Sequence, residues 1–190
     1  MAEQKATDIL MAEHRGIERM LNVVEAAAAR VERGEPVPPA LFADAAAFFA
    51  NFADRCHHSK EEQHLFKTMA ERGIPVEGGP IGVMLAEHEQ GRAYVRAMRE
   101  EGDKYAAGTL KDPHRLVEAV RGYAGLLRQH IMKEDRVLYP MAERVLTPMD
   151  QTALVEACER VEREEMGEGE HERFHAMIEQ LEREMAIERA

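Results

Sequence analysis

Several features common in other protein classes are scarce in this 190-residue chain. It contains no tryptophan, aromatic residues make up only 5% of it, and the β-branched alternation that marks strands is rare. Its two cysteines, Cys56 and Cys158, lie far apart, without the spacing of a thiolate zinc site or a disulfide framework. We interpret both as small buried side chains, although Cys56 directly precedes His57.

Positive charge is also in short supply, and no apolar run approaches the length of a membrane span. The net charge of -11 and the pI near 5.3 disfavour nucleic acid and anionic membranes as partners, because both would be repelled. The N-terminus carries Glu3 and Asp8, so it lacks the basic start and apolar middle of a signal peptide. We therefore expect a cytoplasmic protein.

The residues that dominate are the helix formers Ala, Glu, Arg, Leu and Met. Hydrophobic residues make up 45% of the chain and charged residues 32%, and this length suits one well-packed domain over residues 1–190. The fold class predicted from this composition is all-α.

Apolar residues at spacings of three and four predict four long helices, separated by turns rich in glycine and proline. Short links between long helices favour an antiparallel, up-down four-helix bundle with a core over about residues 2–146. A C-terminal extension over about 150–190 should pack on the bundle as a short helix, a glycine hinge at 167–169 and a last helix. The four main helices are predicted at about 2–33, 39–72, 81–107 and 112–146, the last with a kink at Pro140.

The chain contains the same set of histidine and glutamate residues twice. In the first part an Ala-Glu-His triplet ends at His14 and His57-x-x-x-Glu61 follows 43 residues later; in the second the triplet ends at His88 and His130-x-x-x-Glu134 follows 42 residues later. Positions i and i+4 share one face of a helix, so each pair presents an imidazole and a carboxylate together. A single such pair is usually a surface pair, but a repeat in register predicts a metal centre in a bundle core.

Two positions leave alternatives open. His58 and Glu62 are also four residues apart, but superposing Leu65-Phe66 on Leu138-Tyr139 pairs His57 with His130 and pairs His58 with Ile131, which cannot bind metal. We therefore select His57 and Glu61. The same superposition selects Glu134, with Asp135 as the alternative carboxylate. Imidazole suits iron, zinc and copper, and bridging carboxylates suit a pair of hard ions such as iron.

In the order His, His-x-x-x-Glu, His, His-x-x-x-Glu, the chain resembles the hemerythrin-like family, also called the HHE cation-binding domain, over roughly residues 6–146. The resemblance implies a four-helix bundle that holds two non-haem iron ions with an oxo or hydroxo bridge. It implies terminal ligands at His14, His57, His88 and His130, and bridging carboxylates at Glu61 and Glu134.

One departure from the family concerns Arg92, which stands where oxygen carriers have a second histidine one turn after the third-helix histidine. We expect the missing ligand from the tail, at His175 or, second, at His171. Alternatives are that this i,i+4 pair only packs or forms a separate weak site. Tyr123 is a further candidate, although a core tyrosine is the simpler interpretation.

With one imidazole fewer than a carrier, the site favours exchangeable ligands and hence turnover over oxygen transport. The expected function is a reaction with oxygen, peroxide or nitric oxide; the alternative is non-enzymatic oxygen or iron binding, storage or sensing. A ferritin-like ferroxidase is disfavoured because that class uses Glu-x-x-His and mostly carboxylates. The expected partners are these small molecules, and a homodimer is possible.

Overall fold

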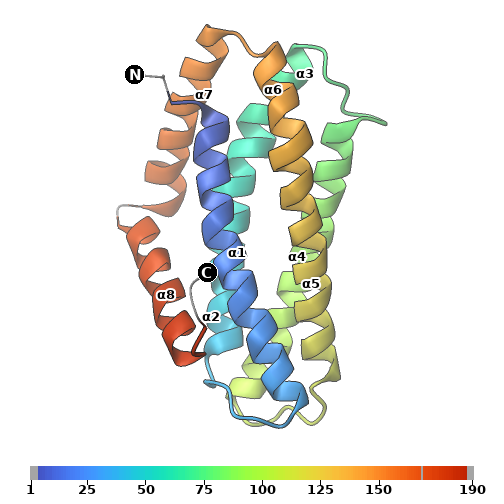
Figure 1. Cartoon of the computed structure of the whole chain (residues 1–190), viewed down its shortest axis with the longest axis vertical. Helices are drawn as coiled ribbons and strands as arrows, with labels where there is room; N and C mark the ends of the chain where they lie inside the picture. The colour runs from blue at the N-terminus through green and yellow to red at the C-terminus, as the bar shows by residue number, and fades with distance from the viewer. Residues whose placement is uncertain (1–3, 168, 188–190) are drawn as a thin grey trace.

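The computed structural model of the protein describes residues 4–167 and 169–187. These residues form helices joined by turns, with no strand among them, so the all-α prediction is confirmed. Four long rods stand side by side, and consecutive rods run in opposite directions along the long axis (Figure 1).

Only the first and third rods are single helices; the other two contain π-helical segments, labelled η. The four rods are α1 (Ala6–Glu32); α2 (Leu41–Phe48), η1 (Phe49–His58), η2 (Glu61–Leu65) and α3 (Phe66–Glu71); α4 (Pro80–Ala106); and α5 (His114–Lys133), η3 (Glu134–Leu138) and α6 (Tyr139–Val145). They agree with the four predicted helices to within a few residues, except that positions 2 and 3 of the first lie outside the described residues.

Glycine and proline set the rod ends, as the sequence predicts. Gly73 follows the second rod with φ +93°, a conformation that L side chains avoid. Pro80 lies in the first turn of α4, where its missing N–H costs no helical hydrogen bond. Pro140 lies in the first turn of α6, directly after η3, so it falls where the helical geometry already changes.

The buried apolar side chains form two clusters with a polar layer between them. On α1, Leu10 belongs to one cluster and Ile17 to the other, and the buried Glu13 and His14 lie between them. α4 repeats this order, with His88 between buried apolar residues of the two clusters. The bundle therefore carries its buried imidazoles and carboxylates in one layer across the core.

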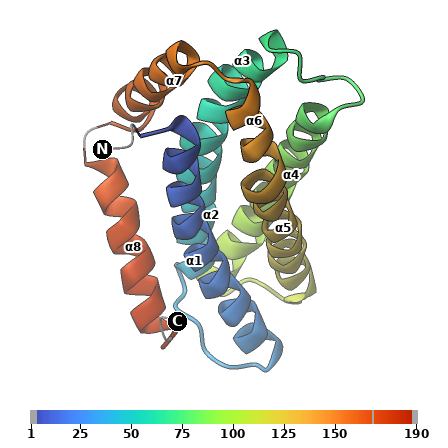
Figure 2. The same cartoon turned by 45° about the horizontal axis from the view of Figure 1, so that its top comes forward.

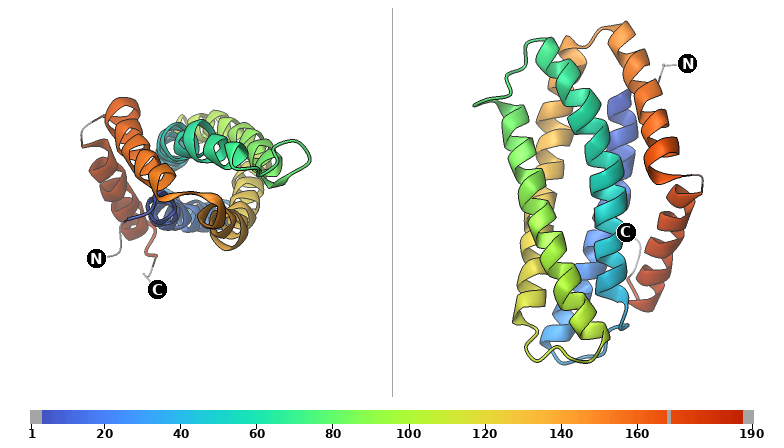
Figure 3. Two further views of the ribbon diagram at one scale, coloured as in Figure 1. Left: turned by 90° about the horizontal axis from the view of Figure 1, so that it is seen from above. Right: turned by 180° about the vertical axis from the view of Figure 1, so that it is seen from behind.

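The C-terminal extension consists of α7 (Pro148–Val161), η4 (Glu162–Met166) and α8 (Glu170–Glu184). These helices pack along α1 and the second rod, outside the four-rod ring (Figures 2 and 3). Phe174, Ile178 and Leu181 of α8 are buried there. Gly167 and Gly169 both have positive φ, in agreement with the predicted hinge. The predicted last helix ends at Glu184 rather than 190, and residues 188–190 lie outside the described part. No helix within the described ranges is long and apolar enough to cross a bilayer.

Candidate metal centre

The polar layer contains two groups of side chains whose ligand atoms lie within 4.8 Å of one another. All of these residues are buried, and together they come from all four rods. The first group is His58, Glu61, His88 and His130; the second is His14, His57 and Glu134. The structure thus brings together the six residues that the repeat predicts in the bundle core and adds a seventh, His58.

Every imidazole in the two groups is held from outside by a carboxylate. The Nδ1 atoms and their partner oxygens are His14 with Asp135 (2.7 Å), His57 with Glu13 (2.8 Å), His58 with Asp54 (3.1 Å), His88 with Glu62 (2.7 Å) and His130 with Glu87 (2.9 Å). An ionised carboxylate only accepts, so each Nδ1 carries a proton, which leaves Nε2 as the ring atom that can face a metal ion. The outer carboxylates therefore fix the tautomer that a metal ligand needs.

Four of the five Nε2 atoms converge in two pairs. His14 Nε2 lies 3.0 Å from His57 Nε2, and His88 Nε2 lies 3.1 Å from His130 Nε2. Two available lone pairs at this separation repel each other unless a proton or a cation lies between them. Each pair is therefore arranged for a shared positive charge.

The two buried carboxylates, Glu61 and Glu134, lie between the imidazole pairs. Glu61 Oε2 is 3.6 Å from His57 Nε2 and 3.5 Å from His88 Nε2, so it faces both groups. Glu134 does the same, with Oε2 3.3 Å from His14 Nε2 and Oε1 3.1 Å from His130 Nε2. Both carboxylates thus lie near imidazoles of both groups.

Three carboxylate oxygens in this layer have no hydrogen-bond partner within the described part of the chain: Glu61 Oε2 and both oxygens of Glu134. The remaining oxygen, Glu61 Oε1, accepts a hydrogen bond of 2.7 Å from the Tyr139 hydroxyl. Imidazole nitrogens lie beside these oxygens, so either a protonated ring or a bound cation must balance the buried negative charge. The donor set of five imidazoles and two carboxylates therefore fits metal ions of the iron type.

The pKa values of Glu61 and Glu134 also indicate that this layer needs positive charge. Burial, and then the charge of Glu134, raises the pKa of Glu61 well above its usual range. Burial acts in the same direction on Glu134, but the imidazoles of His130 and His14 hold its pKa well below that range. The two carboxylates thus compete for positive charge, and a bound cation satisfies both.

The two imidazoles of the second group, His14 and His57, also have pKa values shifted in opposite directions. Burial alone would lower the pKa of His14, but Asp135 and Glu134 raise it to about 9. Burial and the neighbouring His14 lower the pKa of His57 to about 4, although Glu13 opposes this shift. At neutral pH without metal, His14 holds the proton and His57 is ready to coordinate.

The structure corrects the prediction that His58 stays outside the centre. His57 and His58 are both buried, and they lie at the end of η1, where the backbone winds with π-helical rather than α-helical geometry. The ring of His58 stacks on that of His88 at 3.8 Å between centroids. The superposition with Ile131 failed here because it assumed the same helical geometry in both halves. A signal was present, since Asp54 precedes His58 by four residues and binds its Nδ1.

The structure brings neither tail histidine into either group. His175 Cε1 lies 3.9 Å from the position that a Cβ would take at Gly16 of α1. The rings of His171 and His175 lie 5.3 and 6.4 Å from that of Phe52. The imidazole that adds to the four predicted ones is therefore His58. Tyr123 packs edge-on against Phe49, at 4.7 Å between centroids, as a core tyrosine would.

Arg92 supports the centre from outside. Its Nε donates to Asp54 at 2.8 Å and its Nη2 to Glu62 at 2.8 Å. These are the carboxylates that hold His58 and His88. Arg92 therefore holds in place the two carboxylates that orient His58 and His88.

A small cavity of about 140 Å³ lies beside the first group. His58 belongs both to its wall and to the metal-binding group. Apolar side chains and two arginines provide most of the remaining wall. The lining residues are Phe49, Ala50, Asp54, His58, Gly91, Arg92, Val95, Arg96 and Tyr123. The space suits a molecule of a few atoms.

Comparison with known proteins agrees with this geometry. The hemerythrin HHE cation-binding domain matches residues 5–142, and the chain belongs to this family. The chain is similar to the uncharacterized proteins Rv1995 of Mycobacterium tuberculosis and Mb2018 of Mycobacterium bovis. Each is 23% identical over 184 residues, which cover 96% of this chain and 71% of the relative. No solved structure gives a significant match.

Proposed function

We propose that the centre holds two iron ions and that the protein reacts with a small molecule, namely oxygen, peroxide or nitric oxide. The observation that carries the proposal is the set of three buried carboxylate oxygens that have no hydrogen bond within the described residues and that lie among five imidazoles. One ion would be held by His58, Glu61, His88 and His130, and the other by His14, His57 and Glu134. Glu61 and Glu134 face both groups and would bridge the pair.

The mixture of ligand types supports iron over other metals. Imidazole alone would suit zinc or copper, but two shared carboxylates favour a pair of harder ions such as iron. A bound iron pair supplies the electrons that reactions of oxygen, peroxide or nitric oxide require. The second group offers fewer protein donors than the first, which leaves room for an exchangeable ligand.

The protein groups around the site have roles of their own. The five outer carboxylates orient the imidazoles, and the Tyr139 hydroxyl holds one oxygen of Glu61. The apolar clusters on both sides of the layer limit access of water. The cavity at His58 provides space for a small molecule next to the first group.

The experiment that tests the proposal is metal analysis with optical and Mössbauer spectra, after anaerobic ferrous loading and again after exposure to air. We expect about two irons per chain and a visible spectrum that His57→Ala removes. His114→Ala is the matched control, because His114 is exposed on α5 outside both groups. One metal or none in the unaltered chain would contradict the di-iron centre.

A turnover assay then distinguishes an enzyme from a protein that only binds oxygen. Steady consumption of peroxide or nitric oxide by the iron-loaded protein would establish an enzyme. A stable oxygenated form that releases its oxygen under vacuum, without turnover, would establish binding instead.

A further inference from the structure

The C-terminal extension, which lies beyond the family match, reaches the metal centre through a buried lysine. Lys60 Nζ donates to Glu162 Oε1 of η4 at 2.6 Å, and it also forms an ion pair with Glu13 of α1. The Lys60 side chain is 0% exposed and that of Glu13 only 4%. A buried ammonium needs such partners, so the tail supplies half of the negative charge that holds Lys60 in place.

The chain of contacts continues to a candidate ligand. The other oxygen of Glu13, Oε2, lies 2.8 Å from His57 Nδ1. Although burial opposes it, the interactions with His57 and Lys60 lower the pKa of Glu13. A continuous line of contacts thus runs from the tail to the second metal-binding group, through Glu162, Lys60, Glu13 and His57.

The second half of the repeat contains the matching contacts between a lysine, a glutamate and a histidine, but they do not include Glu162 of the tail. Lys133 forms an ion pair with Glu87, and Glu87 Oε2 lies 2.9 Å from His130 Nδ1. Here the Lys133 side chain is 35% exposed and that of Glu87 18%. The helices of the extension pack along α1 and the second rod, whereas Lys133 belongs to the fourth. One ligand support is therefore sealed by protein and the other is open to water.

We propose that Glu162 and Lys60 are positioning residues by which the extension locks His57, so that the ion at His14, His57 and Glu134 is retained longer than the ion at the other group. The inference rests on the proposed two-ion centre. A sealed support cannot exchange its partner for water, so His57 stays oriented each time a metal–ligand bond opens. Water can replace Lys133 at Glu87, so His130 is held less firmly.

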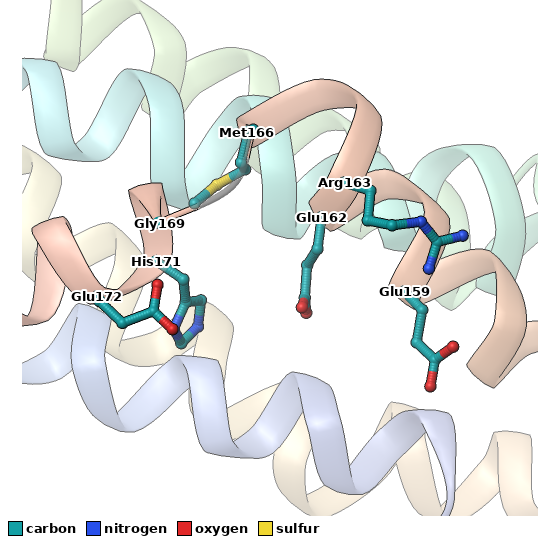
Figure 4. A pocket seen from close by; sticks show the side chains of 8 residues that line it. Glu159, Glu162, Arg163, Met166, Gly169, His171 and Glu172 are labelled. Carbon is teal, nitrogen blue, oxygen red and sulfur yellow. The ribbon is translucent and has the colours of Figure 1, made fainter.

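Glu162 is the accessible end of this line. Its side chain is 40% exposed and lines a hollow of about 640 Å³ between η4 and α8, together with Glu159, His171 and Glu172 (Figure 4). A substitution at Glu162 therefore alters the lock from the surface, without removing a side chain from the core.

The test is the rate at which a chelator removes iron from the full-length, iron-loaded chain. Glu162→Gln keeps the size of the side chain and removes its charge, and Glu159→Gln is the matched control in the same hollow. We expect Glu162→Gln to accelerate release of one of the two irons by about 10-fold, at the lower end of the range for direct partners of ligands, because Glu162 acts on His57 through Lys60 and Glu13. Glu159→Gln should release both at the original rates, and Glu162→Asp should restore most of the retention.

Lys133→Met supplies the comparison between halves. We expect it to change release of the other iron by a smaller factor, because Glu87 is already hydrated. Acceleration of both irons alike in Glu162→Gln, together with a lower melting temperature, would show a purely structural role and overturn the proposal. Unchanged release in Glu162→Gln would overturn it as well.

A zinc-loaded sample keeps this test separate from the iron chemistry. Nitrogen NMR of labelled histidines in the full chain with Zn²⁺ alone reports whether His57 keeps its proton on Nδ1. We expect the His57 signals to shift or broaden in Glu162→Gln and the His130 signals to stay. If the unaltered chain holds no iron pair, the proposed function fails, and this spectrum still decides whether the extension positions His57. Unchanged His57 signals would contradict the lock.

Discussion

The two halves of the bundle support their ligands with the same parts but in different surroundings. In each half the glutamate before the first histidine holds the second histidine, and a lysine three residues after that histidine holds the glutamate. In each half, too, the first histidine binds a carboxylate of the other half: His14 binds Asp135 and His88 binds Glu62. The halves are therefore interlocked, and the repeat builds one shared centre rather than two separate sites.

Differences between the halves occur at matched positions. His58 of the first half corresponds to Ile131 of the second, and Phe66 corresponds to Tyr139. The extra imidazole joins one group and the phenol binds the carboxylate Glu61. Two positions that the repeat would make equivalent thus carry different side chains, which gives the two metal-binding groups different surroundings.

The largest expected effect comes from the shared carboxylates. Glu61→Gln and Glu134→Gln should each weaken the binding of both metals, because each residue faces imidazoles of both groups. We expect a loss greater than the roughly 100-fold that removal of an outer partner can cause. Metal titration followed by calorimetry measures it. Glu101→Gln, a buried carboxylate outside the centre, is the control. Loss of one metal alone would mean that the halves act independently.

His58→Ile makes the first half resemble the second at this position. We expect affinity for one of the two metals to fall by about 10- to 100-fold, comparable to loss of a group that orients the site. Equilibrium dialysis against a metal buffer gives the number. His64→Ile, on the same rod but outside both groups, should bind two metals normally. An unaltered affinity in His58→Ile would show that His58 packs beside the centre without coordinating.

Tyr139→Phe removes the second difference, because Phe66 stands at the matched position. It deletes the donor to Glu61 Oε1 and leaves a fourth buried carboxylate oxygen unpaired. The free energy of unfolding of the metal-free protein should fall by about 1.5 kcal/mol, measured by urea denaturation. Tyr105→Phe, which loses a half-buried bond to the Val37 carbonyl, should cost less. Equal costs would show that the Tyr139 hydroxyl is not specific to the centre.

The pH dependence distinguishes the two imidazoles of the second group. A metal must displace the proton of His14, whose pKa is raised to about 9, whereas His57, with a pKa near 4, is already neutral at pH 7. Affinity should therefore rise with pH up to about 9, by about tenfold per pH unit for one displaced proton. Competition with a metal-ion indicator between pH 6 and 9 measures the slope. A flat profile would show that His14 is unprotonated before metal binds.

The sequence was sufficient for the helices and for six residues of the two groups, because both follow helical periodicity. His14 and His88 lie on inner stripes, and the i,i+4 pairs lie on one face of regular helix. The support network was only partly visible. Glu13 and Glu87 stand out as repeated residues, but their partners are 44 and 43 residues away, and only the packing of the rods shows which histidine each one holds.

His58 and the tail show where periodicity stops being informative. The superposition of the two halves paired His58 with Ile131, so choosing His57 was the consistent prediction. The first half instead winds with π-helical geometry through these positions, whereas α5 of the second half is a regular α-helix. His171 and His175 share a helix face, as expected, but the docking of α8 places them against Gly16 and Phe52. Docking of a separate helix depends on tertiary contacts that no local pattern encodes.

The π-helical stretch also makes the ligand set depend on the length of the chain. Wide helical turns hold an additional residue relative to an α-helix of the same rise. Deleting one residue between Phe48 and His57 would let this rod wind as a regular α-helix and turn one of the two adjacent histidines outward. The number of imidazoles at the centre would then change with no ligand replaced. In this fold, a single-residue deletion is a route to a different set of imidazoles at the centre.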